Sequence, residues 1–425
     1  MKKMTGNEII KTYINFFIER GHTYVESSSL VPQDDPTVLW INAGVTPLKK
    51  YFDGTIVPKN KRLVSCQKCI RTGDIEEVGK TARHHTFFQM LGNFSIGDYF
   101  KKEAIPWAWE LLTSPKYFDL DKNKLYITVY THDEETYNIW LSLGVKPSHL
   151  IKLDTNFWEI GPGPSGPDTE IFYDRGEKYD KQKKGISMLQ NEEENDRYIE
   201  IWNNVLSQFN ATEGLSREEY PELPHKNIDT GMGVERMACI LGETETNYET
   251  DLFMPIMHKI EEISNIPYTG QIEFKVIADH IRTLTFALSD GAVFENVGRG
   301  YVLRRLLRRA ARHGRLLGIE GKFLSKLCET VIEGSKDGYP ELEEKRTFIT
   351  KVISEEEDKF NKTIDQGLSI LNDMEAELAS KGENVLSGAD AFKLYDTYGF
   401  PIDLTKEILE EKNITIDEAG FNAAM

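Results

Sequence analysis

The sequence predicts an α+β domain that is followed by a mostly α-helical domain. In residues 1–255, strand-like segments such as LYITVY at 125–130 alternate with segments of helical periodicity. In residues 256–425 helical periodicity dominates, and one apolar pattern at 349–378 continues well beyond an average helix. A chain of 425 residues is long enough for more than one core. We therefore expect two domains, 1–255 and 256–425.

The first elements can be read from capping and proline signals. Thr5 and Glu8 have the spacing of a capping box, and the apolar positions that follow recur with helical periodicity until Gly21. Residues 27–50 carry three prolines around VLWINAG, which predicts a short strand between turns. A helix should thus lead into a loop-rich segment that feeds a sheet.

Residues 62–100 predict a hairpin with a functional site. RLVSCQKCIRTGDIEEVG and the following TARHHTFFQMLGNFSIGDYF read as two strands joined by a polar loop, with Arg71 at the end of the first strand. A guanidinium fork matches phosphate oxygens, and aromatic side chains on the second strand could accept a base. The residues alone leave two interpretations open, a nucleotide pocket or a packed aromatic cluster.

A second candidate is NIDTGMGVERMACILG at 227–242. Asp229, Gly231 and Gly233 indicate a strand that ends in a tight approach, and VERMACIL then turns helical with Arg236 in its first turn. An arginine there gains nothing from the helix dipole, whose amino end is already positive. We favour an anion-binding role for Arg236 over a surface charge.

Several other sites are disfavoured by the sequence. GPGPSG at 161–166 matches a dinucleotide fingerprint by its letters, but its prolines forbid the helix that the fingerprint needs, and no Walker-type loop occurs. Cys66, Cys69, His84 and His85 lack zinc-ligand spacing on strands, so we favour a structural role for them. Four cysteines make no disulfide framework, and no apolar stretch could span a membrane. We expect a cytoplasmic protein without membrane contact.

A net charge of −18 means that any polyanion must bind a local basic surface. GRGYVLRRLLRRAARHGR at 298–315 provides one, because Arg304, Arg308, Arg312 and Arg315 share a helical face. The alternative is a helix that is salt-bridged to the chain's own carboxylates; we favour phosphate contact because the rest of the chain is so acidic. Near the end, Thr415 and Glu418 form another capping-box signature, and the apolar face that follows stops abruptly. We expect an N-terminal part of a longer protein.

These segments together resemble the class II aminoacyl-tRNA synthetases, in the form found in the alanyl-tRNA synthetases. The hairpin with Arg71 is similar to motif 2, GMGVERMACIL at 231–241 to motif 3, and SSSLVPQDDPTVLWINAG at 27–44 to motif 1. The likeness extends to YDTYGFPIDLT at 395–405. It implies a catalytic domain with a six-stranded antiparallel sheet flanked by helices, and a helical domain that recognises the tRNA acceptor stem.

The resemblance also implies an activity and its residues. Members join L-alanine to ATP, with Mg²⁺, as alanyl-adenylate, and then transfer the alanyl group to the 3′ end of tRNA(Ala). Arg71 and Arg236 would be catalytic ligands of the α-phosphate and of the far end of ATP. The implied ATP-binding residues are Arg71, Asp74, Phe88, Met90, Gly233 and Arg236. The implied alanine-binding residues are Trp158, Asn203, Val205, Asp229 and Gly231, with Asp229 on the α-ammonium.

For tRNA, the resemblance implies that Asn296 and Asp396 read a G·U pair of the acceptor stem, and we add the arginine face with Arg304, Arg308 and Arg312. The loop at 72–78 is shorter than in many members, and Ser165 and Asp168 stand where cysteines are common. No zinc is expected in this chain, which by itself we expect to be monomeric. Two alternatives stay open: a paralogue that passes an activated amino acid to another acceptor, and a non-catalytic RNA-binding relative.

Overall fold

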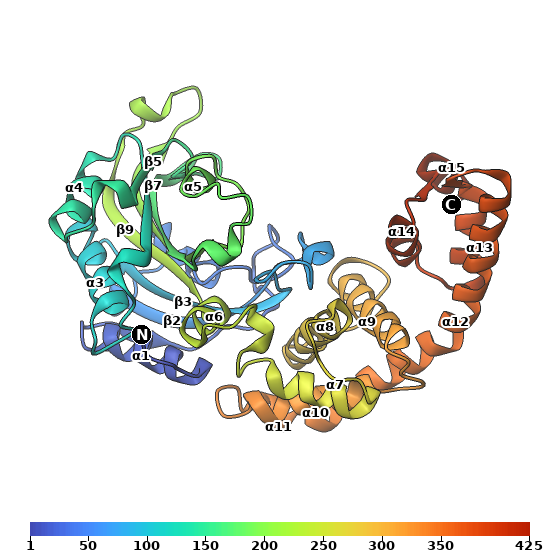
Figure 1. Ribbon diagram of the computed structural model, residues 1–425. Coiled ribbons are helices and arrows are strands. Elements are labelled where there is room, and N and C mark those ends of the chain that lie inside the picture. Colours follow the sequence, from blue (N-terminus) through green and yellow to red (C-terminus); the bar gives the residue numbers. More distant parts are fainter. The chain divides into compact units, whose positions relative to one another are not determined.

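The computed structural model describes residues 1–425 and consists of two compact units, Met1–Met254 and Pro255–Met425 (Figure 1). The first unit is built on a nine-stranded sheet with the order β1-β2-β3-β9-β8-β7-β4-β5, to which β6 adds by pairing with β7. The strands are β1 (Thr23–Val25), β2 (Arg62–Ile70), β3 (Phe87–Ile96), β4 (Leu125–Tyr130), β5 (Leu150–Leu153), β6 (Phe157–Trp158), β7 (Gly163–Asp174), β8 (Tyr198–Ala211) and β9 (Glu222–Gly233).

The interior of this sheet is antiparallel. Each neighbouring pair in the run β2-β3-β9-β8-β7-β4 is antiparallel, whereas β1 pairs with β2 and β5 pairs with β4 in parallel. The α+β class is therefore confirmed, and the expected six antiparallel strands form the centre of a larger mixed sheet. The hairpin prediction for residues 62–100 is confirmed as well, since β2 pairs with β3 along its whole length.

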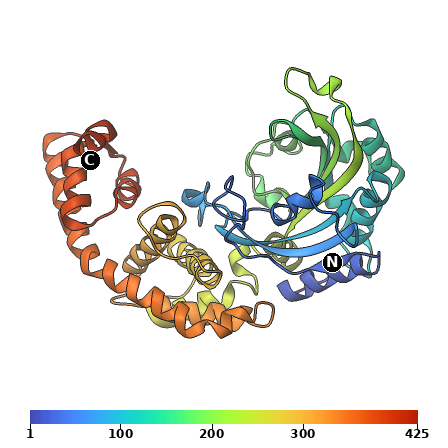
Figure 2. The ribbon, with the colours of Figure 1, turned by 180° about the vertical axis from the view of Figure 1, so that it is seen from behind.

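Helices cover one face of the sheet. The first unit contains α1 (Gly6–Ile18), α2 (Lys49–Phe52), α3 (Lys101–Thr113), α4 (Glu134–Ser142), α5 (Ser187–Gln190) and α6 (Val234–Gly242), and α7 (Met254–Ser264) begins at the boundary. Helix α1 starts where the sequence predicted, because the Thr5 side chain accepts a hydrogen bond from the Glu8 amide. Its apolar face packs on β2 and β3 and shares one core with α3, α4 and α6 (Figures 1 and 2).

The second unit is almost entirely helical. It contains α8 (Ile272–Ser289), α9 (Gly298–Leu316), α10 (Leu324–Ser335), α11 (Glu341–Glu344), α12 (Arg346–Lys381), α13 (Gly388–Tyr398), α14 (Ile402–Glu410) and α15 (Glu418–Ala424). The strands β10 (Val385–Leu386) and β11 (Thr415–Ile416) form a small parallel pair. The long helix that the apolar pattern predicted is α12, which has 36 residues. No helix of the structure has both the length and the apolar character that a membrane crossing requires.

Two local predictions are wrong. VLWINAG forms no strand; its backbone is held by single hydrogen bonds from the Ile41 amide to the Leu30 carbonyl and from the Ile70 amide to the Ile41 carbonyl. Thr415 does not cap the last helix, because it belongs to β11 and Asp417 takes the cap by accepting from the Gly420 amide. In both places a tertiary partner for the backbone outweighs the local signal.

Candidate active site

One pocket of about 440 Å³ in the first unit contains every residue that the resemblance assigned to ATP and alanine. It opens on the face of the sheet that the helices leave free, because most of its lining residues on β3, β8 and β9 alternate with core residues. Met90, Asn203 and Gly231 line it, whereas Leu91 and Trp202 point into the core. The predicted lining residues are Arg71, Asp74, Phe88, Met90, Trp158, Asn203, Val205, Asp229, Gly231, Gly233 and Arg236.

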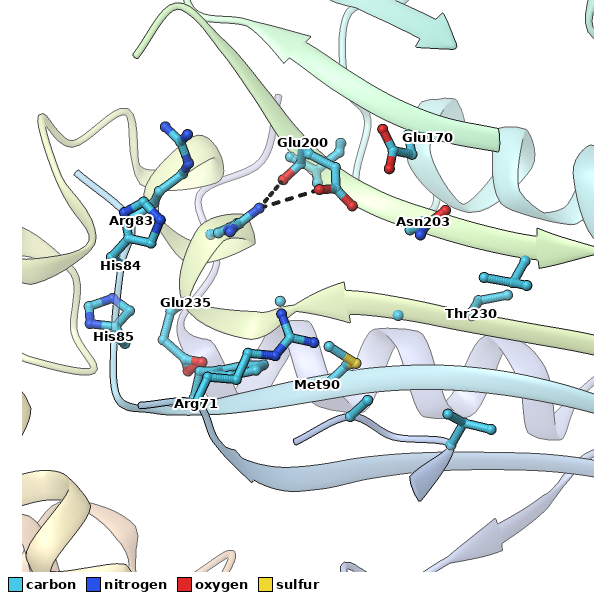
Figure 3. Close-up of a pocket in the computed structure, with 18 of the residues that line it drawn as sticks. Arg71, Arg83, His84, His85, Met90, Glu170, Glu200, Asn203, Thr230 and Glu235 are labelled. Carbon is cyan, nitrogen blue, oxygen red and sulfur yellow. Dashed lines mark hydrogen bonds and ion pairs between the residues drawn. The ribbon is translucent and has the colours of Figure 1, made fainter. Parts of the chain in front are cut away.

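Strand register brings the lining residues into rows across the sheet. Glu170 of β7 lies opposite Asn203 of β8, which lies opposite Gly231 of β9. In the next row Val205 lies opposite Asp229. Because opposite residues of an antiparallel pair are only about 4.5–5.5 Å apart at Cβ, residues distant in sequence meet on one patch of the floor. Figure 3 shows Glu170, Glu200 and Asn203 across the pocket from Arg71 and Met90.

A β-bulge places Glu200 in the pocket. Residues three apart on a regular strand point to opposite faces, yet Glu200 and Asn203 both line the pocket. The pairing of β7 with β8 shifts between Ile171–Trp202 and Phe172–Glu200, which leaves Ile201 as the extra residue. The bulge thereby turns Glu200 to the side of Asn203.

Arg71 lies at the end of β2 beside an aromatic ring. Its amide donates to the Thr86 carbonyl at 2.9 Å, which continues the hairpin ladder, and its Nε donates to the Asn42 carbonyl at 3.0 Å. The guanidinium carbon lies 5.0 Å from the centroid of the Phe88 ring. The two terminal nitrogens have no partner in the protein, so they are available to an anion beside that ring.

Arg236 is anchored from the opposite side. It lies in the first turn of α6, as predicted. Its Nη1 donates to the Glu200 carbonyl at 3.1 Å and lies 3.8 Å from a carboxylate oxygen of Glu200. Dashed lines mark these two contacts at the labelled Glu200 in Figure 3. Burial lowers the pKa of its guanidinium from the ordinary value. A bound anion would therefore stabilise the charged form of this guanidinium.

The rest of the pocket is rich in carboxylates. Burial raises the pKa of Asp229 to about 7, and no hydrogen bond or ion pair of the protein reaches its carboxylate. Burial and then the charges of Glu200 and Asp168 raise the pKa of Glu170 to about 9. Asp168 is not a lining residue, and burial and then the charge of Glu200 raise its pKa to about 7. A bound cation would relieve this cost, so the site favours a cationic ligand on the Asp229 side.

The Met90 side chain lies close to Gly231 in the pocket. A Cβ at this position would lie 2.8 Å from the sulfur of Met90. That sulfur is itself held by the Gly44 amide, which donates to it at 3.4 Å. Val205 lies in the neighbouring row, so Met90, Gly231 and Val205 line the same part of the pocket.

Sequence reasoning missed several lining residues. They are Ala43, Val45, Arg83, His84, His85, Glu170, Glu200, Ile201, Thr230, Glu235 and Asn247. Glu170 and Glu200 lie in strand-like segments, but the bulge that aims Glu200 has no sequence signal of its own. His85, in contrast, has a structural role: its Nε2 lies 2.9 Å from the Asn247 amide nitrogen, and its ring stacks on Phe253.

In the second unit, most of the arginines on the α9 face contact the chain's own acidic groups. The Nε atom of Arg304 lies 2.7 Å from a carboxylate oxygen of Glu356 of α12. Arg312 donates to both carboxylate oxygens of Glu411 at 3.1 and 2.9 Å. Arg315 lies 3.4 Å from Asp365. Arg308 has no carboxylate partner and lies over the Phe360 ring. These are the contacts that the salt-bridge interpretation of this helix anticipates.

The two residues expected to read bases are both exposed. Asn296 precedes α9, and its side-chain oxygen accepts a hydrogen bond from Arg304. Asp396 lies on the exposed side of α13. Arg304 thus contacts Asn296 as well as Glu356.

Comparison with known proteins is consistent with this geometry. The family model described as tRNA synthetases class II (A) matches residues 8–425. The alanine–tRNA ligases of Lactococcus lactis subsp. lactis (strain IL1403) and Streptococcus sanguinis (strain SK36) are each 58% identical over 428 residues, which is 100% of this chain and 49% of each relative. The chain therefore spans about half the length of the curated relatives it matches. A solved histidyl-tRNA synthetase of S. aureus aligns over 58% of this chain and 68% of its own, with a TM-score of 0.33 and 11% identity, a likeness too slight to support an inference.

The family model covers nearly the whole chain, and its match includes both the sheet that carries the pocket and the helical unit. The chain belongs to the class II (A) tRNA synthetase family.

Proposed function

We propose that this chain carries the alanine–tRNA ligase activity named for its relatives. It would activate L-alanine with ATP to give alanyl-adenylate and pyrophosphate, and then transfer alanine to the 3′ end of tRNA(Ala). The observation that supports this most directly is the pairing of Asp229, a carboxylate without a partner in a small subsite, with Arg71 and Phe88 in the same pocket. The Asp229 carboxylate suits the ammonium group of an amino acid, and Arg71 with Phe88 suits the phosphate and base of a nucleotide.

For ATP, we propose that adenine stacks on Phe88 near Met90 and Gly233. The free nitrogens of Arg71 would hold the α-phosphate, and Arg236 would bind the far phosphates. Asp74 lies at the start of the short turn after Arg71 and lines the same pocket. In-line displacement at phosphorus needs positioning and charge stabilisation rather than a protein nucleophile, and two fixed guanidinium groups supply both.

The donor set of the pocket also fits Mg²⁺. Glu170 and Glu200 are carboxylates that crowd each other, and a hard divalent cation would relieve their repulsion while phosphate oxygens complete its coordination. When bound with ATP, the ion would neutralise charge that develops on the leaving pyrophosphate. The protein residues would hold and orient it.

For the amino acid, Asp229 would receive the α-ammonium group. Asn203, Val205, Gly231 and Trp158 would enclose the methyl side chain. The Gly231–Met90 contact excludes larger side chains by size, whereas serine adds only a hydroxyl, which an apolar wall rejects poorly.

The decisive experiment is ATP–pyrophosphate exchange with each amino acid in turn, without tRNA. We expect exchange to be strongest with alanine, weaker but measurable with serine, and absent with larger side chains. Arg71→Ala is expected to abolish the exchange, and Lys351→Ala, an exposed lysine of the second unit, provides the control. A folded sample that binds ATP but shows no exchange with any amino acid would favour the non-catalytic alternative.

For the acceptor, we propose that the helical unit binds the acceptor stem of tRNA(Ala) through Asn296 and Asp396. Arg308 is the arginine of the α9 face that is best placed to contact phosphate, because Arg304 and Arg312 would first have to leave Glu356 and Glu411. Such a ligase would work in the cytoplasm. Exposed amides and carboxylates can contact base edges in a wide RNA groove.

A further inference from the structure

A buried polar cluster lies directly beneath the amino-acid subsite. It consists of Tyr13 of α1, His22, Asn93 of β3, Tyr99 and Thr230 of β9, and each is at most 4% exposed. Trp202 and Phe17 are in ring contact with Tyr13. Burying five polar side chains is costly unless every donor and acceptor is used.

The backbone ladder between β3 and β9 is interrupted at this cluster. The pairing stops at Leu91–Met232 and resumes in the same register at Phe94–Asp229, so that Asn93 and Thr230 form no backbone pair. Instead the Asn93 amide donates to the Thr230 hydroxyl at 3.1 Å. A side-chain oxygen thus replaces a main-chain acceptor between the two residues of β9 that line the alanine subsite, Asp229 and Gly231.

The cluster has one consistent direction of hydrogen bonding. The Asn93 side-chain oxygen accepts from the hydroxyls of Thr230 at 2.6 Å and Tyr13 at 2.9 Å. The Asn93 amide group donates to the Tyr99 hydroxyl at 3.0 Å, which lies 2.8 Å from His22 Nε2.

The far end of the cluster fixes this direction. His22 Nδ1 lies 2.8 Å from the Phe17 carbonyl, which can only accept, so Nδ1 carries the proton and Nε2 accepts from Tyr99. Burial lowers the pKa of His22 to about 4, which keeps the ring neutral. A chain of bonds therefore runs from the end of α1 to the middle of β9.

We propose that Tyr13, Asn93 and Thr230 are positioning residues that set the amino-acid subsite of this pocket by fixing the opened segment of β9 between Asp229 and Gly231. The role rests on the proposed function in one respect, that Asp229 and Gly231 bind the amino acid. On the β3 side the ladder is open, so between Asp229 and Gly231 the main chain of β9 is paired through β8 alone. The buried hydroxyls of Thr230 and Tyr13 hold the segment from the β3 side, where the backbone pairing is missing.

The test uses Tyr13→Phe, Thr230→Val and the conservative Thr230→Ser in the full chain. Each of the first two removes one buried hydroxyl, a net loss of about 1 kcal/mol of hydrogen bonding, so the KM for alanine in pyrophosphate exchange should rise about five- to tenfold. The KM for ATP and kcat should stay within about twofold, because Arg71 and Phe88 lie outside the opened segment. Thr230→Ser keeps the hydroxyl and should restore the alanine KM.

A matched control is Thr128→Val on β4. Thr128 is as buried as Thr230, and its hydroxyl accepts from the Asn156 side chain at 2.8 Å, but neither residue lines the pocket. It should lower the melting temperature without changing the alanine KM. Variants of the cluster that destabilise the fold yet leave the alanine KM at the control value, or that raise the KM values for alanine and ATP alike, would overturn the proposal.

A second measurement does not depend on activity. Hydrogen exchange followed by mass spectrometry should be faster at residues 227–233 in Tyr13→Phe and Thr230→Val than in the wild type, and unchanged at residues 125–130. If the wild type supports no alanine-dependent pyrophosphate exchange, the proposed function fails, and the hydrogen-exchange measurement still decides whether the cluster holds β9. Unchanged hydrogen exchange at residues 227–233 would refute the positioning role.

Discussion

The buried carboxylate of Asp229 lowers the stability of the folded chain when it is ionised. Its pKa is about 7 in the folded chain, whereas an unfolded aspartate titrates near about 3.9. Between these values the folded state binds more protons than the unfolded state, so the free energy of unfolding falls as the pH rises from about 4 to 7. Above about pH 7 the folded chain thus holds a buried, ionised carboxylate, and a bound cation would offset the loss of stability.

We therefore expect Asp229→Asn to melt at a higher temperature than the wild type at pH 8 and at a similar temperature at pH 4. The same variant should lose amino-acid-dependent exchange, and in the wild type the KM for the amino acid should rise as the pH falls below about 7. Thermal unfolding at both pH values and exchange kinetics across the range test this. Asp373→Asn, at an exposed position of α12, should show no such pH dependence; equal behaviour of the two variants would contradict the expectation.

Gly231 and Met90 show how a single contact can limit the size of the ligand. Addition of a Cβ at position 231 would bring it 2.8 Å from the Met90 sulfur, which lies within a flexible side chain that can move. We expect Gly231→Ala to fold with nearly unchanged stability and to raise the KM for alanine strongly, since the new methyl group takes space from the substrate. Urea unfolding and exchange kinetics measured on the same sample separate the two effects. A large loss of stability would show that Met90 cannot yield.

At the scale of elements, α9 is the clearest case of a helix whose charges serve the fold. Arg309, on the buried side, contacts Glu407 of α14, while Arg304 and Arg312 contact Glu356 and Glu411. The helix is thus tied to α12, to α14 and to the residue that follows α14. An acidic chain provides partners for its own basic helix, which sequence periodicity alone cannot reveal.

Arg312→Ala should lower the free energy of unfolding by about 1–2 kcal/mol, since it removes a buried side chain and a contact with the half-exposed Glu411. The slope of tRNA affinity against salt should not change. Arg308→Ala, by contrast, should reduce that slope by about one unit if Arg308 binds a phosphate. Urea unfolding and tRNA binding at several salt concentrations measure both quantities. A reduced salt slope for Arg312→Ala would contradict this expectation and indicate that Arg312 also binds a phosphate.

At the scale of the whole molecule, we propose that the first unit forms the adenylate and that the second unit binds the tRNA. The pocket that contains Arg71 and Asp229 lies in Met1–Met254, and Asn296 and Asp396 lie in Pro255–Met425. We expect Asn296→Ala and Asp396→Ala to leave pyrophosphate exchange unchanged and to reduce charging of tRNA(Ala) about tenfold or more, since one lost base contact costs about 1–3 kcal/mol. Equal losses in exchange and charging would refute this division.

Much of the molecule follows from local sequence. The cap at Thr5, the hairpin at residues 62–100, the turn from β9 into α6 at Gly233 and the length of α12 are each predicted by signals within a short window, and each is confirmed. The resemblance implied six antiparallel strands, but the order of the strands was not predicted, because periodicity carries no information about which strands become neighbours.

The sequence by itself determined the class of fold and the residue types of the site, since capping, strand alternation and helical periodicity are local properties. Only the tertiary structure decided that Glu200 turns into the pocket at a bulge and that Thr230 replaces a backbone acceptor. It likewise decided that Arg304 and Arg312 contact carboxylates. Register, ladder breaks and ion-pair partners depend on segments distant along the chain, whose approach is set by packing of the whole core rather than by any one segment.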